Sequence, residues 1–448
     1  MTNLRQRLDI IPDSTLDLHN IRQRLDRSIP MRPTAAIVGS GVSGLVAAYA
    51  LRNTHTVTLF EADDRFGGHA HTHTITGPDG RTRNVDSGFI VHNERTYPNL
   101  LRIFRELGIK TQATEMSMSI NCAECGLQYA GGRGLRGIAA QPARLLQPRF
   151  LRMLFEVPRF HRAARKLLDG TMPADLTWGE FLERGNYSDY FVHHFAIPLV
   201  SCVWSSGDAD SRAYPAKHLF EFLQHHGMLT IGNSPTWRTI VGGSQQYVQR
   251  IISLIPDARA STPVSGVRRT GDGVEITSAS GVEQFDCAVI ATHASTAIRL
   301  LTDADDVETG ALKAIGYSSN ETWLHTDDRL LPTAAQARAS WNYRMRNCAD
   351  SAQAVVVSYW MNRLMHLDGD TDYVVTLNSP QHVDESRVIA RMQYEHPVFT
   401  VDAVQAAATL RNAGGPRLAF AGAHLGWGFH EDGARSGVEA AKKLGAAW

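Results

Sequence analysis

The residues with the clearest chemical use are the glycines of Gly39-Ser-Gly41-Val-Ser-Gly44 and the acid Glu61. Gly39 permits a tight turn, and Gly41 lets the backbone approach a diphosphate without a Cβ clash. Gly44 allows a helix to pack closely on a strand, and the N-terminus of that helix offers N–H groups to phosphate oxygens. Glu61, about 20 residues further on, suits ribose hydroxyls and disfavours a 2′-phosphate. The pattern predicts a dinucleotide site formed by Gly39, Ser40, Gly41, Val42, Ser43, Gly44 and Glu61.

The elements around this loop have the order of a βαβ unit. Residues 35–38 are an apolar run typical of a buried parallel strand, residues 43–52 favour a helix, and residues 57–60 favour a second strand. This context matters because a lone G-x-G-x-x-G is a weak signal. A second copy at 132–137 is rejected as a nicotinamide site, since we expect no buried strand before it and Pro142 would interrupt its helix.

The later elements are predicted in less detail. An amphipathic helix is expected at 96–108, and a further helix from about residue 433. No elements are assigned within 301–409. Strands are expected at 264–267, 274–276, 287–291 and 418–421.

Beyond Glu61 the chain resembles the superfamily of flavin-containing amine oxidases and phytoene desaturases. The resemblance rests on Gly67-Gly68 and Val85-Asp-Ser-Gly88-Phe89, then on Val241-Gly-Gly-Ser244 with Val264, Cys287-Ala-Val-Ile-Ala-Thr292, and Phe420-Ala-Gly422-Ala423 with Gly433-Ala-Arg-Ser-Gly437. Within the superfamily it is similar to a bacterial subgroup of predicted NAD/FAD-binding proteins associated with cyclopropane-type fatty-acid modification. The likeness to that subgroup lies in Gly67–Thr72, Phe89–Pro98 and Gly428–Gly433.

The resemblance implies an FAD cofactor and an α/β fold. The expected architecture is a Rossmann-type FAD-binding domain of the amine-oxidase kind, interleaved with a mixed α+β substrate domain. A helix N-terminus near the end of the chain would face the flavin N1–C2 carbonyl and stabilise negative charge on the reduced ring. The further FAD contacts that the resemblance implies are Ala62, Arg65, Gly67, Gly68, His69, Gly88, Phe89, Ile90, Val264, Thr292, Gly422, Gly433, Ala434 and Ser436.

A chain of 448 residues is too long for one ordinary core, so we expect two interleaved domains. An N-terminal arm at 1–33 contains a repeat, residues 3–9 and 20–26, that is either dispensable or a docking segment. The FAD-binding domain is expected to take 34–95, 240–300 and 410–448, and the substrate domain 96–239 and 301–409.

The function expected from the resemblance is hydride transfer between flavin N5 and an apolar substrate, an unsaturated or modified fatty-acyl lipid. Amine oxidases carry Arg where this chain has His69, and no aromatic cage is recognised near Gly422. Amine oxidation therefore stands as an alternative, together with redox-neutral double-bond isomerisation and a flavin-binding scaffold for a partner enzyme. If the reaction needs an acid–base group, the candidates are His430, Glu431 and His69.

Composition limits the partners and the compartment. The formal net charge is zero, so bulk electrostatics gives no case for nucleic acid. Five cysteines suit a reducing cytoplasm, and neither a secretory signal nor a membrane-spanning run is recognised. Residues 133–168 carry eight Arg and one Lys against the single acid Glu156. This segment is either a solvated helix face or a contact with anionic lipid at the inner face of the membrane. The oligomeric state is not predicted.

Two groups of potential metal ligands are assigned other roles. His69, His71 and His73 alternate, and we favour hydrogen bonding around the cofactor loop over a metal site. Cys122-x-x-Cys125 has a spacing seen in zinc and redox sites, but no second pair follows at ligand spacing, so an inert pair is favoured. No metal site is therefore predicted.

The remaining candidate site residues are two tryptophans and two pairs of histidines. Trp204 and Trp237 are interpreted as a substrate wall or as core. The pairs His193-His194 and His225-His226 are interpreted as capping or surface residues rather than catalysts.

Overall fold

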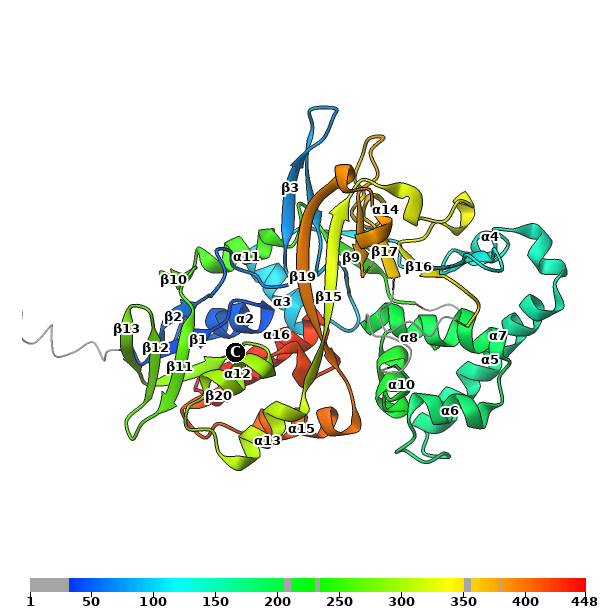
Figure 1. Ribbon diagram of the computed structural model, residues 1–448. Helices are drawn as coiled ribbons and strands as arrows, with labels where there is room; N and C mark the ends of the chain where they lie inside the picture. Colours follow the sequence, from blue (N-terminus) through cyan, green and yellow to red (C-terminus); the bar gives the residue numbers. More distant parts are fainter. Residues whose placement is uncertain (1–31, 205–210, 230–233, 350–355, 379) are drawn as a thin grey trace, which may run out of the picture.

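A five-stranded parallel sheet forms one half of the molecule. The computed structural model describes residues 32–204, 211–229, 234–349, 356–378 and 380–448 (Figure 1), so the N-terminal repeat lies outside the described residues. The strands run in the order β10-β2-β1-β14-β20, and this parallel sheet confirms the predicted fold class. Their bounds are Thr34–Val38 (β1), Thr56–Phe60 (β2), Asp257–Arg259 (β10), Cys287–Ile290 (β14) and Leu418–Phe420 (β20).

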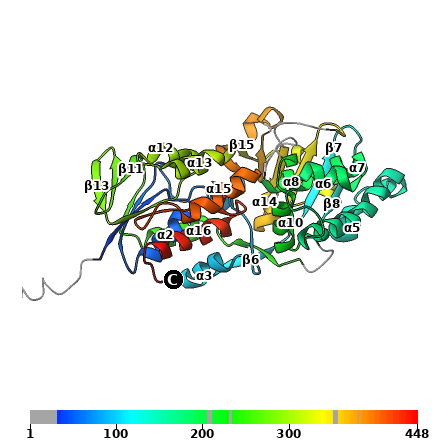
Figure 2. The same cartoon turned by 90° about the horizontal axis from the view of Figure 1, so that it is seen from below.

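Two buried helices pack together against this sheet: α2 (Val42–Leu51) and α16 (His430–Lys443), which lie side by side in Figure 2. A Cβ on Gly437 would lie 2.4 Å from the Ser43 carbonyl oxygen, so glycine is what allows this close approach. The helix predicted from about residue 433 begins three residues earlier. The Phe429 N–H donates to the Asp432 carboxylate, which satisfies one of the free N–H groups at the helix start.

The opposite face of the sheet is covered by a small antiparallel sheet and three helices. Val267, Ile276, Leu312 and Leu410 from these elements pack in one apolar cluster with Ile290 of β14. The elements are β11 (Val264–Arg269), β12 (Val274–Ser278), β13 (Gly281–Phe285), α12 (Ala294–Leu300), α13 (Asp306–Ala314) and α15 (Val401–Asn412).

A seven-stranded mixed sheet, in the order β19-β15-β18-β17-β16-β7-β8, forms the middle of the molecule. Its two long strands, β15 and β19, run side by side beside the parallel sheet (Figure 1). Most of this sheet comes from the segment that sequence patterns left unassigned. The strands are β7 (Met118–Cys122), β8 (Gln128–Gly131), β15 (Gly316–His325), β16 (Trp341–Met345), β17 (Val356–Trp360), β18 (Val374–Leu377) and β19 (Val388–Val398).

A helical region lies at the end of the molecule away from β1 and β2 (Figures 1 and 2). Its core is aromatic: the Phe160 ring lies 5.7 Å from the rings of both Trp178 and Phe220. The elements are α4 (Gly134–Ile138), η1 (Pro142–Leu146), α5 (Pro148–Leu168), α6 (Trp178–Gly185), α7 (Asp189–Phe191), the π-helical η2 (Val192–Ala196), α8 (Ile197–Trp204) and α10 (Ala216–His225).

The reason given for rejecting the second glycine pattern is partly wrong. A partly buried strand, β8, does precede residues 132–137, and the short helix α4 follows. However, β8 pairs antiparallel with β7 at the edge of the mixed sheet, so the segment is not a βαβ unit.

Several further elements complete the fold. The helix predicted at 96–108 is confirmed as α3 (Pro98–Leu107). All five strands of the parallel sheet come from the three segments assigned to the FAD-binding domain, although the division into domains itself stays a prediction. The other elements are β3 (Thr72–Thr76), β4 (Thr82–Asp86), β5 (His92–Asn93), β6 (Thr111–Thr114), β9 (Trp237–Ile240), α11 (Gln245–Ile252), α14 (Met361–Met365), η3 (Asp328–Leu330), η4 (Ala335–Ala337), η5 (Pro380–His382), η6 (Glu385–Arg387) and η7 (Ala423–Leu425).

Candidate functional site

A cavity of about 660 Å³ extends from the carboxyl ends of the parallel strands to the mixed sheet. The strands on the two sides of β1 are reached by connections that run in opposite directions, which is where open α/β sheets bind ligands. Most of the predicted cofactor residues line this cavity. They are Gly39, Ser40, Gly41, Val42, Ser43, Glu61, Ala62, Arg65, Gly68, His69, Gly88, Phe89, Ile90, Thr292 and Gly422.

The glycines of the first loop have different surroundings. Gly39 has a φ of +98°, and a Cβ there would lie 2.9 Å from the Ala291 carbonyl oxygen. A Cβ on Gly44 would lie 1.9 Å from the Gly39 carbonyl oxygen, so Gly44 is needed for the fold itself. A Cβ on Gly41 would meet no protein atom within 4 Å. The missing side chain of Gly41 thus leaves open space in the cavity wall, as the approach of a diphosphate requires.

Three buried polar atoms of residues that line the cavity have no hydrogen-bond partner among the described residues: Arg65 Nη1, His69 Nε2 and Trp341 Nε1. Buried polar atoms in folded proteins nearly always have partners, so these three atoms point to a ligand that supplies hydrogen-bonding groups. A cation beside the open loop at Gly41 suits phosphate oxygens. The residues present therefore fit an FAD.

Glu61 stands directly after β2, where the ribose-binding acid was predicted. Its carboxylate accepts hydrogen bonds from the Ser40 N–H at 2.8 Å and from the Ser40 hydroxyl, and its other oxygen accepts from the Asp63 N–H at 2.9 Å. These bonds fix the carboxylate at the mouth of the glycine loop.

His69 lies in a group of buried aromatic and imidazole rings. Its ring centre is 4.8 Å from that of Tyr394 and 5.6 Å from that of His396. Burial, reinforced by neighbouring imidazoles, lowers the pKa of His69 well below its usual value, and burial lowers the pKa of His396 to about 4. Asn320 donates to His396 Nδ1 at 3.1 Å, as a neutral imidazole allows. His69 and His396 are therefore neutral at pH 7.

The other alternating histidines bond around the loop, as favoured from the sequence. His71 Nδ1 lies 3.0 Å from the Tyr394 hydroxyl, and His73 Nε2 lies 2.9 Å from the Ser87 hydroxyl. Because both Ser87 and Tyr394 line the cavity, these bonds support its wall.

His430 also lines the cavity. Its ring stacks on Phe89, with the ring centres 3.5 Å apart, and its Nε2 lies 2.6 Å from the Tyr247 hydroxyl. Burial lowers the pKa of His430 well below its usual value. The stacked and bonded ring is held in one orientation at the start of α16.

Glu431 has a structural position in place of the cavity position that its predicted catalytic role would require. Its side chain lies outside the cavity, and its carboxylate accepts from the Asn99 and Leu100 N–H groups at 3.0 and 3.1 Å and from the Asn99 side chain at 2.7 Å. Those N–H groups belong to the first turn of α3, where they have no intrahelical partner. Glu431 therefore caps α3 and joins it to α16.

Six predicted cofactor residues do not line the cavity: Gly44, Gly67, Val264, Gly433, Ala434 and Ser436. A Cβ on Gly433 would lie 2.4 Å from Val42 Cγ1, so this glycine lets α16 pack on α2. The Ser436 hydroxyl accepts from the Gly422 N–H at 2.9 Å and thereby positions a residue that does line the cavity. The FAD contacts predicted for these residues stay predictions.

The end of the cavity away from the glycine loop is apolar, and sequence patterns missed most of it. Trp204 lines it, as one interpretation allowed, whereas Trp237 is buried in the core and stacks on His226. The alternation of apolar and polar residues in Ala390-Arg-Met-Gln-Tyr-Glu395 was the sequence signal that could have predicted β19 and located Tyr394 and His396. This end is formed by Ile90, Val91, Trp204, Trp341, Tyr359, Leu377, Pro397 and Phe429.

The comparison with protein families decides which family the chain belongs to. The profile described as flavin containing amine oxidoreductase matches residues 42–444. The chain belongs to this family. At that level the predicted superfamily, the FAD cofactor and the class of FAD-dependent oxidoreductase are confirmed.

Individual members of the family show how far the likeness extends. Carotenoid phi-ring synthase of Streptomyces griseus is 27% identical over 61% of this chain and 55% of its own length. The chain thus spans about half the length of the curated relatives it matches. Cyclohexylamine oxidase from Brevibacterium oxydans has a TM-score of 0.68 at 16% identity, covering 92% of this chain and 98% of that one. A CLA-producing fatty acid isomerase from P. acnes has a TM-score of 0.63 at 16% identity, covering 94% of this chain and 100% of that one. These two structures establish the shared fold alone.

Proposed function

We propose that the protein is an FAD-dependent oxidoreductase that transfers a hydride between flavin N5 and an apolar substrate, an unsaturated or modified fatty-acyl chain. The observation that carries the proposal is the continuity of the cavity: one space runs from the glycine loop at Gly41 to the aromatic wall around Trp341 and Tyr359. Apolar and aromatic walls of this kind bury hydrocarbon, and the fixed polar groups lie at the dinucleotide end.

The chain's own residues would hold the cofactor at its polar end. Gly41 and the N-terminus of α2 would receive the diphosphate, Arg65 would neutralise part of its charge, and Glu61 would accept from the ribose. When bound, FAD supplies the hydride acceptor or donor. The aromatic wall would then orient the substrate and exclude water.

His69 is the residue best placed to hold or move a proton. It lines the cavity, and its buried Nε2 atom has no hydrogen-bond partner in the part of the chain that the structure describes, whereas Nε2 of His430 already bonds to Tyr247. A neutral imidazole can accept a proton at one nitrogen while the other donates.

The carboxylates of the cavity argue against a cationic amine as substrate. Three acids are among the described lining residues, and two of them are already bonded: Glu61 is held by the Ser40 backbone and hydroxyl, and Glu395 lies 2.9 Å from His293 Nδ1. A bound ammonium group would have to compete for the oxygens of these two acids, and the third, Asp63, is exposed two residues from Glu61.

Access to acyl lipids would come through residues 133–168. Four large apolar side chains on this segment are exposed: Leu135 (83%), Leu146 (84%), Leu151 (36%) and Phe155 (79%). The one acid, Glu156, is buried and accepts from the Ser188 hydroxyl at 2.6 Å, so the exposed charges of the segment are positive. Apolar side chains among cations match an anionic lipid surface. None of the described helices is long and apolar enough to cross a membrane.

Anaerobic reduction of the bound flavin distinguishes the reactions. We expect bleaching of the visible flavin absorption with acyl lipids and none with small amines. Bleaching by amines alone would replace the lipid proposal with amine oxidation. Acyl isomer formation without net flavin reduction would indicate isomerisation, and a flavoprotein inert to both panels would indicate a scaffold.

A further inference from the structure

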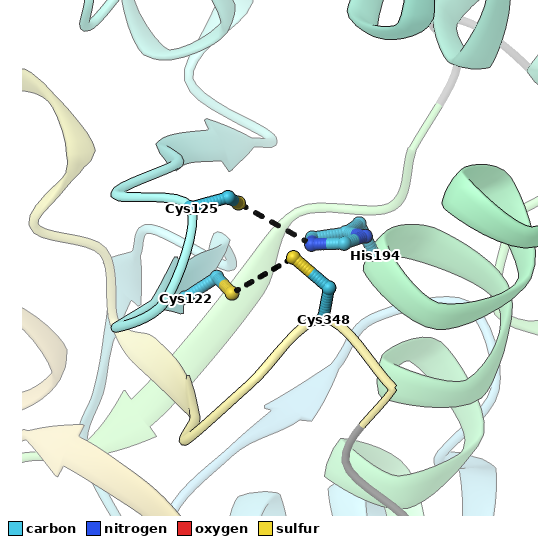
Figure 3. A group of neighbouring side chains, drawn as sticks. All are labelled: Cys122, Cys125, His194 and Cys348. Carbon is cyan, nitrogen blue, oxygen red and sulfur yellow. Dashed lines mark hydrogen bonds between the residues drawn. The ribbon is translucent and has the colours of Figure 1, made fainter.

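Four side chains with metal-binding atoms meet away from the flavin cavity: Cys122, Cys125, His194 and Cys348. Their Sγ and imidazole nitrogen atoms all lie within 4.8 Å of one another, and Figure 3 shows the side chains pointing toward a common centre. The two spaced cysteines predicted as an inert pair are thus completed by a histidine and a third cysteine. None of the four lines the flavin cavity.

Two of the distances between the ligand atoms are close to those of tetrahedral coordination. A Zn²⁺ ion holds sulfur at about 2.3 Å and imidazole nitrogen at about 2.0 Å, so in a tetrahedron two sulfurs are about 3.8 Å apart and sulfur and nitrogen about 3.5 Å. Cys122 Sγ lies 3.8 Å from Cys348 Sγ, and Cys125 Sγ lies 3.6 Å from His194 Nε2. We propose that these three cysteines and His194 bind a structural Zn²⁺ ion.

The backbone around the two spaced cysteines has the form of a tight metal-binding turn. It connects β7 to β8, with the Gly126 N–H donating to the Cys122 carbonyl and the Cys122 N–H to the Leu127 carbonyl. Gly126 has a φ of +67°, which glycine adopts without strain. Arg144 donates to the Cys125 carbonyl at 2.6 Å and places a cation beside a site of three thiolates.

The histidine is oriented as a metal ligand. His194 lies in the π-helical turn η2, and its Nδ1 lies 3.2 Å from the Tyr190 carbonyl oxygen. A carbonyl can only accept, so Nδ1 carries the proton and Nε2 presents its lone pair toward Cys125. The ring also stacks on Tyr190, with ring centres 4.1 Å apart.

The third cysteine comes from a different part of the chain. Cys348 follows β16, which pairs in parallel with β7 so that Met345 lies opposite Cys122. The Cys348 N–H donates to the Glu124 carboxylate at 2.7 Å, which holds this loop over the cysteine turn.

Four protein ligands leave no open position, as is typical of structural rather than catalytic zinc. The ion would join the mixed sheet to η2, which continues directly into α8. The end of α8 carries Trp204 at the cavity wall, so the metal would fix the helix that shapes the apolar end of the cavity.

The test is metal analysis of the full-length protein, purified with its flavin under reducing conditions and without chelator. We expect about one zinc per chain, and X-ray absorption at the zinc edge showing three sulfur ligands and one nitrogen. Cys348→Ser and His194→Ala should each weaken zinc binding by roughly tenfold or more. His194→Cys should retain the metal with four sulfurs. Cys287→Ser, which removes a buried thiol of β14 outside the cluster, should leave zinc content unchanged.

Three outcomes would overturn the proposal. The first is wild-type protein that retains no zinc after incubation with ZnSO₄ and dialysis. The second is an intact mass showing a Cys122–Cys348 disulfide in that protein. The third is a zinc shell of oxygen and nitrogen alone. Since zinc content is measured apart from turnover, the result does not depend on the proposed reaction.

Discussion

At the scale of single residues, Gly41 and Gly44 differ in what surrounds their missing side chains. Gly41 borders open cavity, whereas a Cβ on Gly44 would collide with the backbone of Gly39. Gly41→Ala should therefore keep the thermal stability of the apoprotein within about 0.5 kcal/mol and weaken FAD binding at least about tenfold. The matched Gly44→Ala should lower stability itself. Calorimetry of the apoproteins and FAD titration separate the two effects, and equal FAD affinity in Gly41→Ala and wild type would contradict the account.

His69 offers a second prediction at this scale. Because His69 lines the cavity and its buried Nε2 has no hydrogen-bond partner among the described residues, His69→Asn should reduce turnover by about 10²-fold or more while FAD remains bound. The measurement is kcat with the lipid that bleaches the flavin, together with flavin content. His366→Asn is the matched control, since His366 lies outside the cavity with a φ of +54° that asparagine accepts. Unchanged kcat in His69→Asn would remove the proposed proton role.

At the scale of elements, Glu431 shows why the spacing of chemical groups could not assign every role. Glu431 follows His430 directly, yet helix geometry turns it away from the cavity to α3. Glu431→Ala should destabilise the protein by about 1–3 kcal/mol, because the α3 N–H groups lose their buried acceptor. Turnover well below the melting temperature should be retained. Chemical denaturation and kcat test both statements, and loss of turnover without loss of stability would contradict them.

The predicted contact with anionic membranes rests on the exposed apolar side chains of η1 and α5. Leu146→Ser with Phe155→Ser should weaken binding to vesicles of anionic phospholipid by roughly tenfold or more, because two buried contacts with the acyl region are lost. The control is Val282→Ser with Val307→Ser, which changes exposed apolar residues on β13 and α13. Sedimentation with vesicles measures the effect. Equal binding of both double variants would contradict a contact through 133–168.

Reversing the charge of arginines in 133–168 also tests the lipid contact, but only at positions whose side chains do not support the fold. Arg159 donates to the Gly185 and Asn186 carbonyls, and Arg149 lies over the Tyr190 ring, so changing them would disturb packing. Arg162 and Arg165 are exposed and are the better positions for that test.

The parallel sheet was predictable because its signals are local. Four of its strands contain a short apolar run, and the first of them continues directly into a glycine loop whose spacing is fixed by phosphate geometry. The edge strand β10 has no such run and was not predicted. The mixed sheet could not be predicted from sequence patterns, because its strands pair across long sequence distances, as in the pairing of β16 with β7. The cavity wall at Trp341 and Tyr394 was therefore missed. The proximity of Cys122 to Cys348, which lies 226 residues away in the sequence, was not predicted for the same reason.

At the scale of the whole molecule, buried neutral histidines tie stability to pH. Burial lowers the pKa of His92, His226, His325 and His396 to about 4. The unfolded chain takes up these protons near pH 6.5, and the folded chain only near pH 4. Stability present above pH 6.5 should therefore be lost as the pH falls toward 4. Denaturant midpoints between pH 7.5 and 4.5 measure this, and a midpoint that stays constant or rises on acidification would contradict it.

The central claim concerns the whole chain: residues near its start and near its end form one cavity that binds FAD through the open loop at Gly41. The most direct measurement is the flavin content of the purified protein, before and after incubation with excess FAD and gel filtration. The account predicts one non-dialysable FAD per chain in the wild type and little or none in Gly41→Val. A wild-type protein that remains colourless after that incubation would contradict it.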